Sequence, residues 1–164
     1  LDAEGDLVLL QDQDRSLWHH AQIDEGIALV QRALAAGPAR PYVLQAAIAA
    51  VHAEAASGAD TDWPQIVALY ELMLRIEPSP VVALNHAVAV AMRDGPAAGL
   101  TRVDAILARG ELGDYHLAHA ARADFCRQLG RVDEARAAYG AALKLAQQAP
   151  ERRFLEQRLR ELAN

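Results

Sequence analysis

Apolar residues recur at helical spacing along most of the chain, in stretches of about 13 to 20 residues that are separated by turn signals. The turn signals fall at Gly37-Pro38, Ser57-Gly58, Pro78-Ser79-Pro80, Asp94-Gly95-Pro96, residues 110–113, Gly130 and Pro150. Asp62 precedes Trp63-Pro64, and Ser79 precedes Pro80. An N-cap residue followed by proline near the first helical position predicts a helix start at both places.

The first residues follow a different pattern. Residues 7–10 are apolar and predict a short extended segment after the turn at Gly5. Residues 11–14 are polar and predict an entry into a helix that starts at Arg15 or Ser16.

A repeated pattern of small and apolar residues is the most informative feature of the chain. A small or aliphatic residue is followed four positions later by an apolar one, by an apolar pair three and four positions beyond that, and often by proline after a further four. This pattern starts at Gly26, Ile66, Gly99 and Ala135, at intervals of 40, 33 and 36 residues. Ala87 and Ala123 stand twelve residues before the last two starts, where paired helices would approach closely. The period is typical of the tetratricopeptide repeat (TPR), a helix–turn–helix unit of about 34 residues.

We therefore predict an all-α fold, in which antiparallel helix pairs stack as a TPR-like right-handed α-solenoid. The helical repeat domain is expected over residues 15–164 and an extended, polar linker over residues 1–14. Residues 150–162, with mixed charges, are expected to form a C-terminal capping helix.

Composition supports close helix packing and a cytoplasmic protein. Alanine fills 36 of the 164 positions and only 5% of residues are aromatic. The single cysteine, Cys126, cannot form a disulfide within the chain and is expected to be a small core residue. The longest apolar run, residues 46–51, is too short for a membrane span, and residues 1–6 lack the features of a signal peptide. We expect a fragment of a longer cytoplasmic protein.

The formal net charge of −6 argues against direct binding of nucleic acid. Residues 1–60 hold nine acidic and three basic residues, whereas residues 101–164 hold nine acidic and eleven basic ones. The basic residues alternate with carboxylates at helical spacing, as in Arg131, Glu134 and Arg136, which is typical of a solvated helix face.

The first helices of the repeats would line a concave surface that could bind a protein segment. The polar and aromatic candidates for that lining are Tyr42, Gln45, His52, Asn85, His86, His116, His119 and Arg122. A carboxylate clamp at Asn85 is disfavoured because its companion lysines are missing.

Enzymatic and metal-binding interpretations find little support. His116 and His119 are three residues apart and could face one metal ion, but no cysteine or carboxylate pattern accompanies them, and we favour groove histidines. Asp12 and Asp14 lack the spacing of a calcium loop, and Asp14 suits a helix cap. No glycine-rich phosphate loop is present. We expect no enzyme, no cofactor and no metal.

Several runs resemble the C-terminal region of one family of bacterial RNA polymerase sigma factors. These are sigma-24-like factors of the extracytoplasmic-function (ECF) class with a TPR-like C-terminal extension. The resemblance rests on residues 5–18, 41–54, 61–63, 78–85, 95–100, 115–117 and 150–156. The most specific stretches are Asp12-Gln13-Asp14-Arg15-Ser16 with Trp18, and residues 44–52. His86 stands where the family is expected to have Arg, and His19 where Asp is expected.

The resemblance implies a regulatory extension of an ECF sigma factor that modulates transcription initiation. Its partners would be the upstream sigma domains of the same chain, the RNA polymerase core and a YCII-related (DGPF-type) protein, and promoter DNA would be reached only through the N-terminal domains. We expect Asp12, Gln13, Asp14, Arg15 and Trp18 to form the junction with those domains.

Three alternatives stay open. Trp18 could instead be the first core aromatic, with the acidic run before it as a cap. The chain could also be a freestanding TPR-type adaptor that binds peptides. A small-ligand sensor would use groove polarity at Asn85, His86, His116 and His119.

Overall fold

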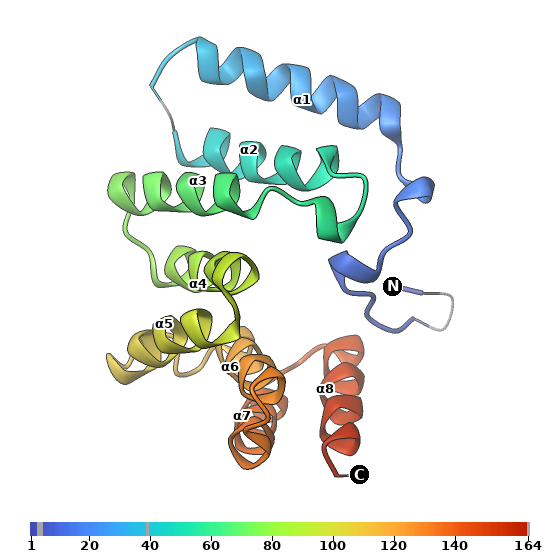
Figure 1. Cartoon of the computed structure of the whole chain (residues 1–164), viewed down its shortest axis with the longest axis vertical. Helices are drawn as coiled ribbons and strands as arrows, with labels where there is room; N and C mark the ends of the chain where they lie inside the picture. The colour runs from blue at the N-terminus through green and yellow to red at the C-terminus, as the bar shows by residue number, and fades with distance from the viewer. Residues whose placement is uncertain (3–4, 39, 164) are drawn as a thin grey trace. The chain divides into compact units, whose positions relative to one another are not determined.

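Every regular element in the part of the chain that the structure describes is helical. The computed structural model describes residues 1–2, 5–38 and 40–163. The α-helices are α1 (His20–Ala35), α2 (Pro41–Glu54), α3 (Trp63–Ile76), α4 (Pro80–Asp94), α5 (Pro96–Ala108), α6 (His116–Gln128), α7 (Val132–Leu145) and α8 (Ala149–Glu161) (Figure 1). Three short 3₁₀ helices, η1 (Leu10–Asp12), η2 (Arg15–Leu17) and η3 (Gly58–Asp60), complete the described elements. The all-α prediction is confirmed.

The chain divides into two compact units. We call residues Leu9–Val82 the α1–α3 unit, and residues Leu1–Val8 together with Ala83–Asn164 the α4–α8 unit, so that the boundary falls in the first turn of α4. In the first unit α1 packs on α2 and α2 on α3, and in the second each helix from α5 to α8 packs on the next. These consecutive contacts are compatible with stacked helix pairs. The predicted division into a linker over residues 1–14 and a repeat domain over residues 15–164 stays a prediction.

The core of the α1–α3 unit comes from α2 and α3. Its fully buried side chains include Leu44 and Val51 of α2 and Ile66 and Val67 of α3. No residue of α1 is fully buried, although α1 carries one of the four repeat patterns. Of the described helices, α2 packs most extensively on α1, so one stripe of α1 is half-buried and Leu29 stays 52% exposed.

Small residues set the helix spacing in the core of the α4–α8 unit. Ala87 of α4 and Ala123 of α6, which the repeat pattern placed at close approaches, are both fully buried. The packing around Gly99 of α5 leaves no room even for a methyl group, because a Cβ atom there would lie 2.5 Å from the Ala91 Cβ and 2.9 Å from Phe125 Cε2. Cys126 is buried in the same core, as predicted. A single methyl group would therefore disturb three helices.

The start of α3 and the end of α6 follow the local sequence signals closely. The Asp62 carboxylate accepts a 2.9 Å hydrogen bond from the Gln65 amide and caps α3, as predicted. At the end of α6, Gly130 adopts φ 72°, which glycine tolerates best. The Arg131 amide donates a hydrogen bond to the Cys126 carbonyl oxygen at 2.9 Å, and the Gly130 amide donates one to the Arg127 carbonyl oxygen at 3.0 Å. These two hydrogen bonds define a Schellman motif.

The helix expected at Arg15 or Ser16 is only one 3₁₀ turn, and this prediction is wrong in its extent. Asp14 caps that turn as predicted, since its carboxylate accepts hydrogen bonds from the amide and hydroxyl of Ser16 at 2.9 and 2.7 Å. The backbone becomes extended at Trp18, with φ −77° and ψ 150°, so α1 starts at His20. Tertiary contacts of Arg15 and Trp18, described below, compete with the local helical pattern. Of the residues expected to be extended, Leu9 has an extended backbone with φ −65° and ψ 148°, residues 7–9 lie outside regular elements, and Leu10 begins η1.

None of the helices in the described ranges is both long and apolar enough to cross a bilayer.

Two glycines in helix interiors give a matched test of the packing. Gly99→Ala is expected to destabilise the α4–α8 unit by about 1–3 kcal/mol, because the added methyl overpacks the contact with Ala91 and Phe125. Gly140→Ala in α7 meets no atom within 4 Å and is expected to stabilise by about 0.5–1 kcal/mol through helix propensity. Urea unfolding followed by circular dichroism measures both free energies, and equal effects would contradict the close approach at Gly99.

Candidate functional site

The side chain of Arg15 ties the start of the α1–α3 unit to the end of α2. Its Nη1 donates hydrogen bonds to the carbonyl oxygen of His52, at 2.8 Å, and to that of Ala55. These carbonyls belong to the last turn and C-cap of α2, where no helical amide is left to pair with them. A cation at a helix C-terminus is also favoured by the helix dipole. Arg15 therefore supplies the hydrogen-bond donors that the C-terminal end of α2 lacks, and we call this contact the Arg15 anchor.

Trp18 is held by the same guanidinium. The Arg15 Cζ atom lies 4.9 Å from the centre of the Trp18 ring, within the range of a cation–π contact. Trp18 is only half-buried, so it is not part of the fully buried core of its unit.

His52 is the third member of this cluster. Its ring stands edge-on to Trp63 at a centroid distance of 5.2 Å and an interplanar angle of 77°. Its Nδ1 atom is buried and has no hydrogen-bond partner. Burial, and secondarily the positive charge of Arg15, hold the pKa of His52 below its ordinary value of 6.5. The ring is therefore neutral near pH 7.

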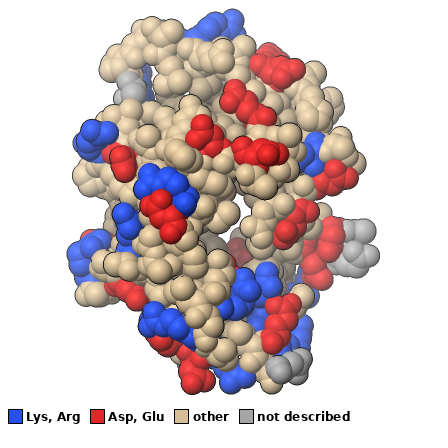
Figure 2. Space-filling model, viewed as in Figure 1, with Lys and Arg blue, Asp and Glu red and all other residues tan. Residues whose placement is uncertain are grey.

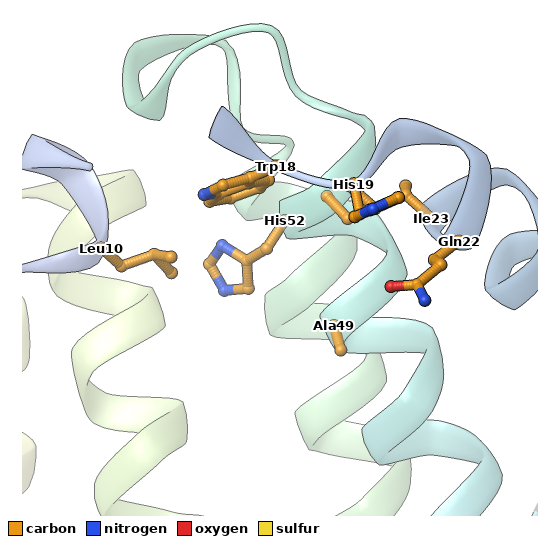
Figure 3. Close-up of a pocket in the computed structure, with 8 residues that line it drawn as sticks. Leu10, Trp18, His19, Gln22, Ile23, Ala49 and His52 are labelled. Carbon is orange, nitrogen blue, oxygen red and sulfur yellow. The ribbon is translucent and has the colours of Figure 1, made fainter. Parts of the chain in front are cut away.

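A groove of about 580 Å³ opens beside this cluster, and we call it the α1–α2 groove. It is lined by Leu10, Trp18, His19, Gln22, Ile23, Ala49, His52 and Ala53. Figure 3 shows Trp18 and His52 next to each other, with Leu10 and Gln22 to either side of them in that view. Ala49 and Ala53 lie one turn apart on α2, and their short side chains leave the space open. No Asp, Glu, Lys or Arg is among the lining residues within the described part of the chain.

The structure brings together Arg15 and Trp18, predicted as junction residues, with His52, predicted as a groove residue. Asp14 serves as a cap, and Asp12 and Gln13 are exposed around η1. Tyr42 (85% exposed) and Gln45 lie on α2 outside the groove lining. No sequence pattern points to Leu10, Gln22 or Ile23, and Ala49 and Ala53 differ from other alanines of α2 only in being one turn apart beside this cluster.

The remaining predicted residues belong to the α4–α8 unit. Asn85 is exposed on α4, whereas His86 is half-buried there. His116 and His119 of α6 have different partners: His116 Nε2 lies 3.3 Å from Glu151 Oε2, and His119 Nε2 lies 2.8 Å from the Gly113 carbonyl oxygen. Within residues 1–2, 5–38 and 40–163, no three or more His, Cys, Asp or Glu side chains are grouped to hold a metal ion.

Arg122 is engaged within the α4–α8 unit. Its Nε donates to Asp104 Oδ1 at 2.7 Å, and its Nη2 to Glu134 Oε2 at 3.3 Å, so it bridges α5, α6 and α7. Nearby, Cys126 is buried, which raises the pKa of its thiol and keeps it from reacting readily.

Acidic and basic side chains are interspersed over the face of the molecule that Figure 2 shows. Several arginines of residues 101–164 are paired with carboxylates, including Arg127 with Asp124 at 2.6 Å and Arg131 with Glu134 at 2.6 Å. These arginines are therefore held by neighbouring carboxylates and do not form a free cationic stripe of the kind that phosphate backbones require.

Comparison with known proteins identifies a longer relative. The chain is 44% identical over 162 residues to an uncharacterized protein of Rhizobium meliloti. The match covers 99% of this chain and 38% of the relative, so the chain spans well under half of that protein's length. No protein-family model matches the chain, and no solved structure matches it either.

Removing the Arg15 side chain tests the cluster. Arg15→Ala leaves two carbonyls at the end of α2 without their partner and is expected to cost about 1–3 kcal/mol of unfolding free energy. It should also shift tryptophan emission to longer wavelength, because Trp18 loses its cation and becomes more exposed. Arg32→Ala, the same change on the exposed side of α1, is the control and should alter neither quantity. If both variants changed the unfolding free energy and the tryptophan emission equally, the role of Arg15 at the end of α2 would be contradicted.

Acidification tests the environment of His52. Because its pKa is lower in the folded chain than the ordinary 6.5, the unfolded chain binds the proton first as the pH falls. Stability is therefore full above 6.5 and declines as the pH falls from there toward the folded pKa. Urea titrations between about pH 7.5 and pH 5.5 should show this decline in the wild type, with a slope below the ~1.4 kcal/mol per pH unit of one full proton. His52→Gln should remove this pH dependence of the unfolding free energy. His20→Gln changes an exposed histidine, is the control, and should keep the dependence. The same slope in the wild type and in both variants would refute the assignment of the dependence to His52.

Proposed function

We propose that this chain is the C-terminal regulatory, protein-interaction domain of an alternative, ECF-type RNA polymerase sigma factor. In this proposal it acts in the cytoplasm and modulates transcription initiation by docking on the sigma domains of its own chain or on the polymerase core. Promoter DNA would be contacted by the N-terminal domains, and a YCII-related (DGPF-type) protein would be a further partner. The domain itself would not be an enzyme.

The anchor at Arg15 is the observation that carries the proposal. The run of residues 11–18 and the run of residues 41–54 carry the most specific part of the resemblance. In the structure they meet, because Arg15 donates to the carbonyl oxygens of His52 and Ala55 and packs on Trp18. Arg15 and Trp18 of the first run and His52 of the second thus form one cluster, which supports the proposal.

A second pair of resembling runs also meets, within the α4–α8 unit. Arg153 Nε donates to Asp6 Oδ1 at 2.5 Å, and Arg153 Nη2 donates to the Gly5 carbonyl at 2.6 Å. Gly5 and Asp6 belong to the first resembling run, and Arg153 to the last. The segment that would lead from the promoter-binding domains is thereby held in place on α8.

Charge and size agree with a docking role in a longer protein. The net charge of −6, concentrated in residues 1–60, favours a basic protein surface as a partner over a phosphate backbone. The relative from Rhizobium meliloti is much longer than the matched part, which leaves room in that protein for further domains.

Run-off transcription tests the proposal directly. We expect a factor truncated before Leu1 to differ from the full-length factor by about fivefold or more on a cognate promoter, as coupling energies of about 1–3 kcal/mol would produce. Adding the 164-residue chain in trans should move the activity back toward the full-length value. Loss on truncation would identify an activating domain, and a gain would identify an inhibitory one.

Unchanged transcription on truncation would refute the regulatory role and favour a freestanding adaptor. In the full-length factor, Arg15→Ala should reproduce part of the truncation effect, whereas the matched variant Arg32→Ala should not.

A further inference from the structure

The α1–α2 groove has the size of a small-molecule site. Its volume of about 580 Å³ falls within the roughly 300–1,000 Å³ of typical ligand pockets. The side chains around it come from η1, from the segment before α1, and from α1 and α2. The Arg15 anchor fixes two of these segments relative to each other, so the groove is built by packing within one unit.

The lining specifies an uncharged ligand. The described lining residues are aliphatic, aromatic or amide side chains with no carboxylate, ammonium or guanidinium group, so a charged ligand would lose hydration there without gaining an oppositely charged partner. Trp18 and His52 offer aromatic rings, while Gln22 and His19 offer hydrogen-bonding groups (Figure 3). Such a mixture of a few polar groups with an apolar wall suits a flat molecule with one or two polar atoms.

A macromolecular partner fits this groove less well. Stable protein interfaces engage about 20 to 30 residues on each side, whereas eight residues line the groove. A neighbouring hollow of about 270 Å³ shares Trp18, Ile23 and Ala53 with it but is lined in addition by Arg15, Asp24 and Glu54. The charged hollow lacks the neutral character that distinguishes the α1–α2 groove.

We propose that the α1–α2 groove binds a small, uncharged aromatic molecule with one or two polar groups, stacked beside Trp18 and His52. This site lies beyond the proposed regulatory function and does not depend on it. If both hold, a ligand in the groove would contact the segment that Arg15 anchors, and its binding would be an input to the regulatory domain.

The uncharged fluorophore N-phenyl-1-naphthylamine is a suitable probe, since its emission rises in apolar sites. We expect saturable binding to the 164-residue chain. Ala49→Phe would fill the groove and should weaken the binding by at least about tenfold. Ala46→Phe is the matched control, because Ala46 is an exposed alanine of the same helix that does not line the groove, and it should bind as the wild type does.

Absence of saturable binding by the wild type, or equal binding by wild type and Ala49→Phe, would overturn the proposal. Circular dichroism and thermal unfolding establish that each variant is folded. Gln22→Phe closes the groove from α1 and tests the same expectation if Ala49→Phe does not fold. The transcription assay is independent of this titration, so either proposal can fail without the other.

Discussion

The contact between the Arg15 guanidinium and the last carbonyls of α2 is the constraint on which the α1–α3 unit depends. Carbonyl groups at a helix end have no helical partner, and a half-buried end leaves them short of water as well. The Arg15 side chain donates hydrogen bonds to two of these carbonyl oxygens and also makes a cation–π contact with Trp18. The groove is a consequence, because the residues before α1 can line it only while Arg15 keeps them beside α2.

Features governed by neighbouring residues could be predicted from the sequence. The all-α fold, the cap at Asp62, the turn at Gly130 and the burial of Ala87 and Ala123 each follow from local spacing or from the repeat pattern. The extent of the helix near Arg15 could not be predicted in this way. Its fate is decided by partners 37 and 40 residues further along the chain, and these override the local preference.

In the candidate site, too, residue types could be predicted from the sequence, whereas contacts between distant residues could not. Arg15, Trp18 and His52 were all expected to matter, but as members of two different surfaces. The sequence held no sign that they touch, because their proximity depends on how a 3₁₀ turn meets the end of a helix. Leu10, Gln22 and Ile23 are ordinary residues by type, and only their position around the two alanines of α2 makes them part of a groove.

The ion pair between Arg153 and Asp6 has a consequence for the order of folding. Residues 1–8 belong to the same compact unit as residues 83–164, and the two partners are 147 positions apart in the chain. During synthesis the α1–α3 unit, which is continuous, leaves the ribosome with all of its contacts available. Residues 1–8 must wait until α8 has been synthesised, and closing so long a loop carries an entropic cost. Residues 1–8 are therefore joined to α8 after the continuous unit between them is complete, which makes this contact late in the folding of this part of the chain.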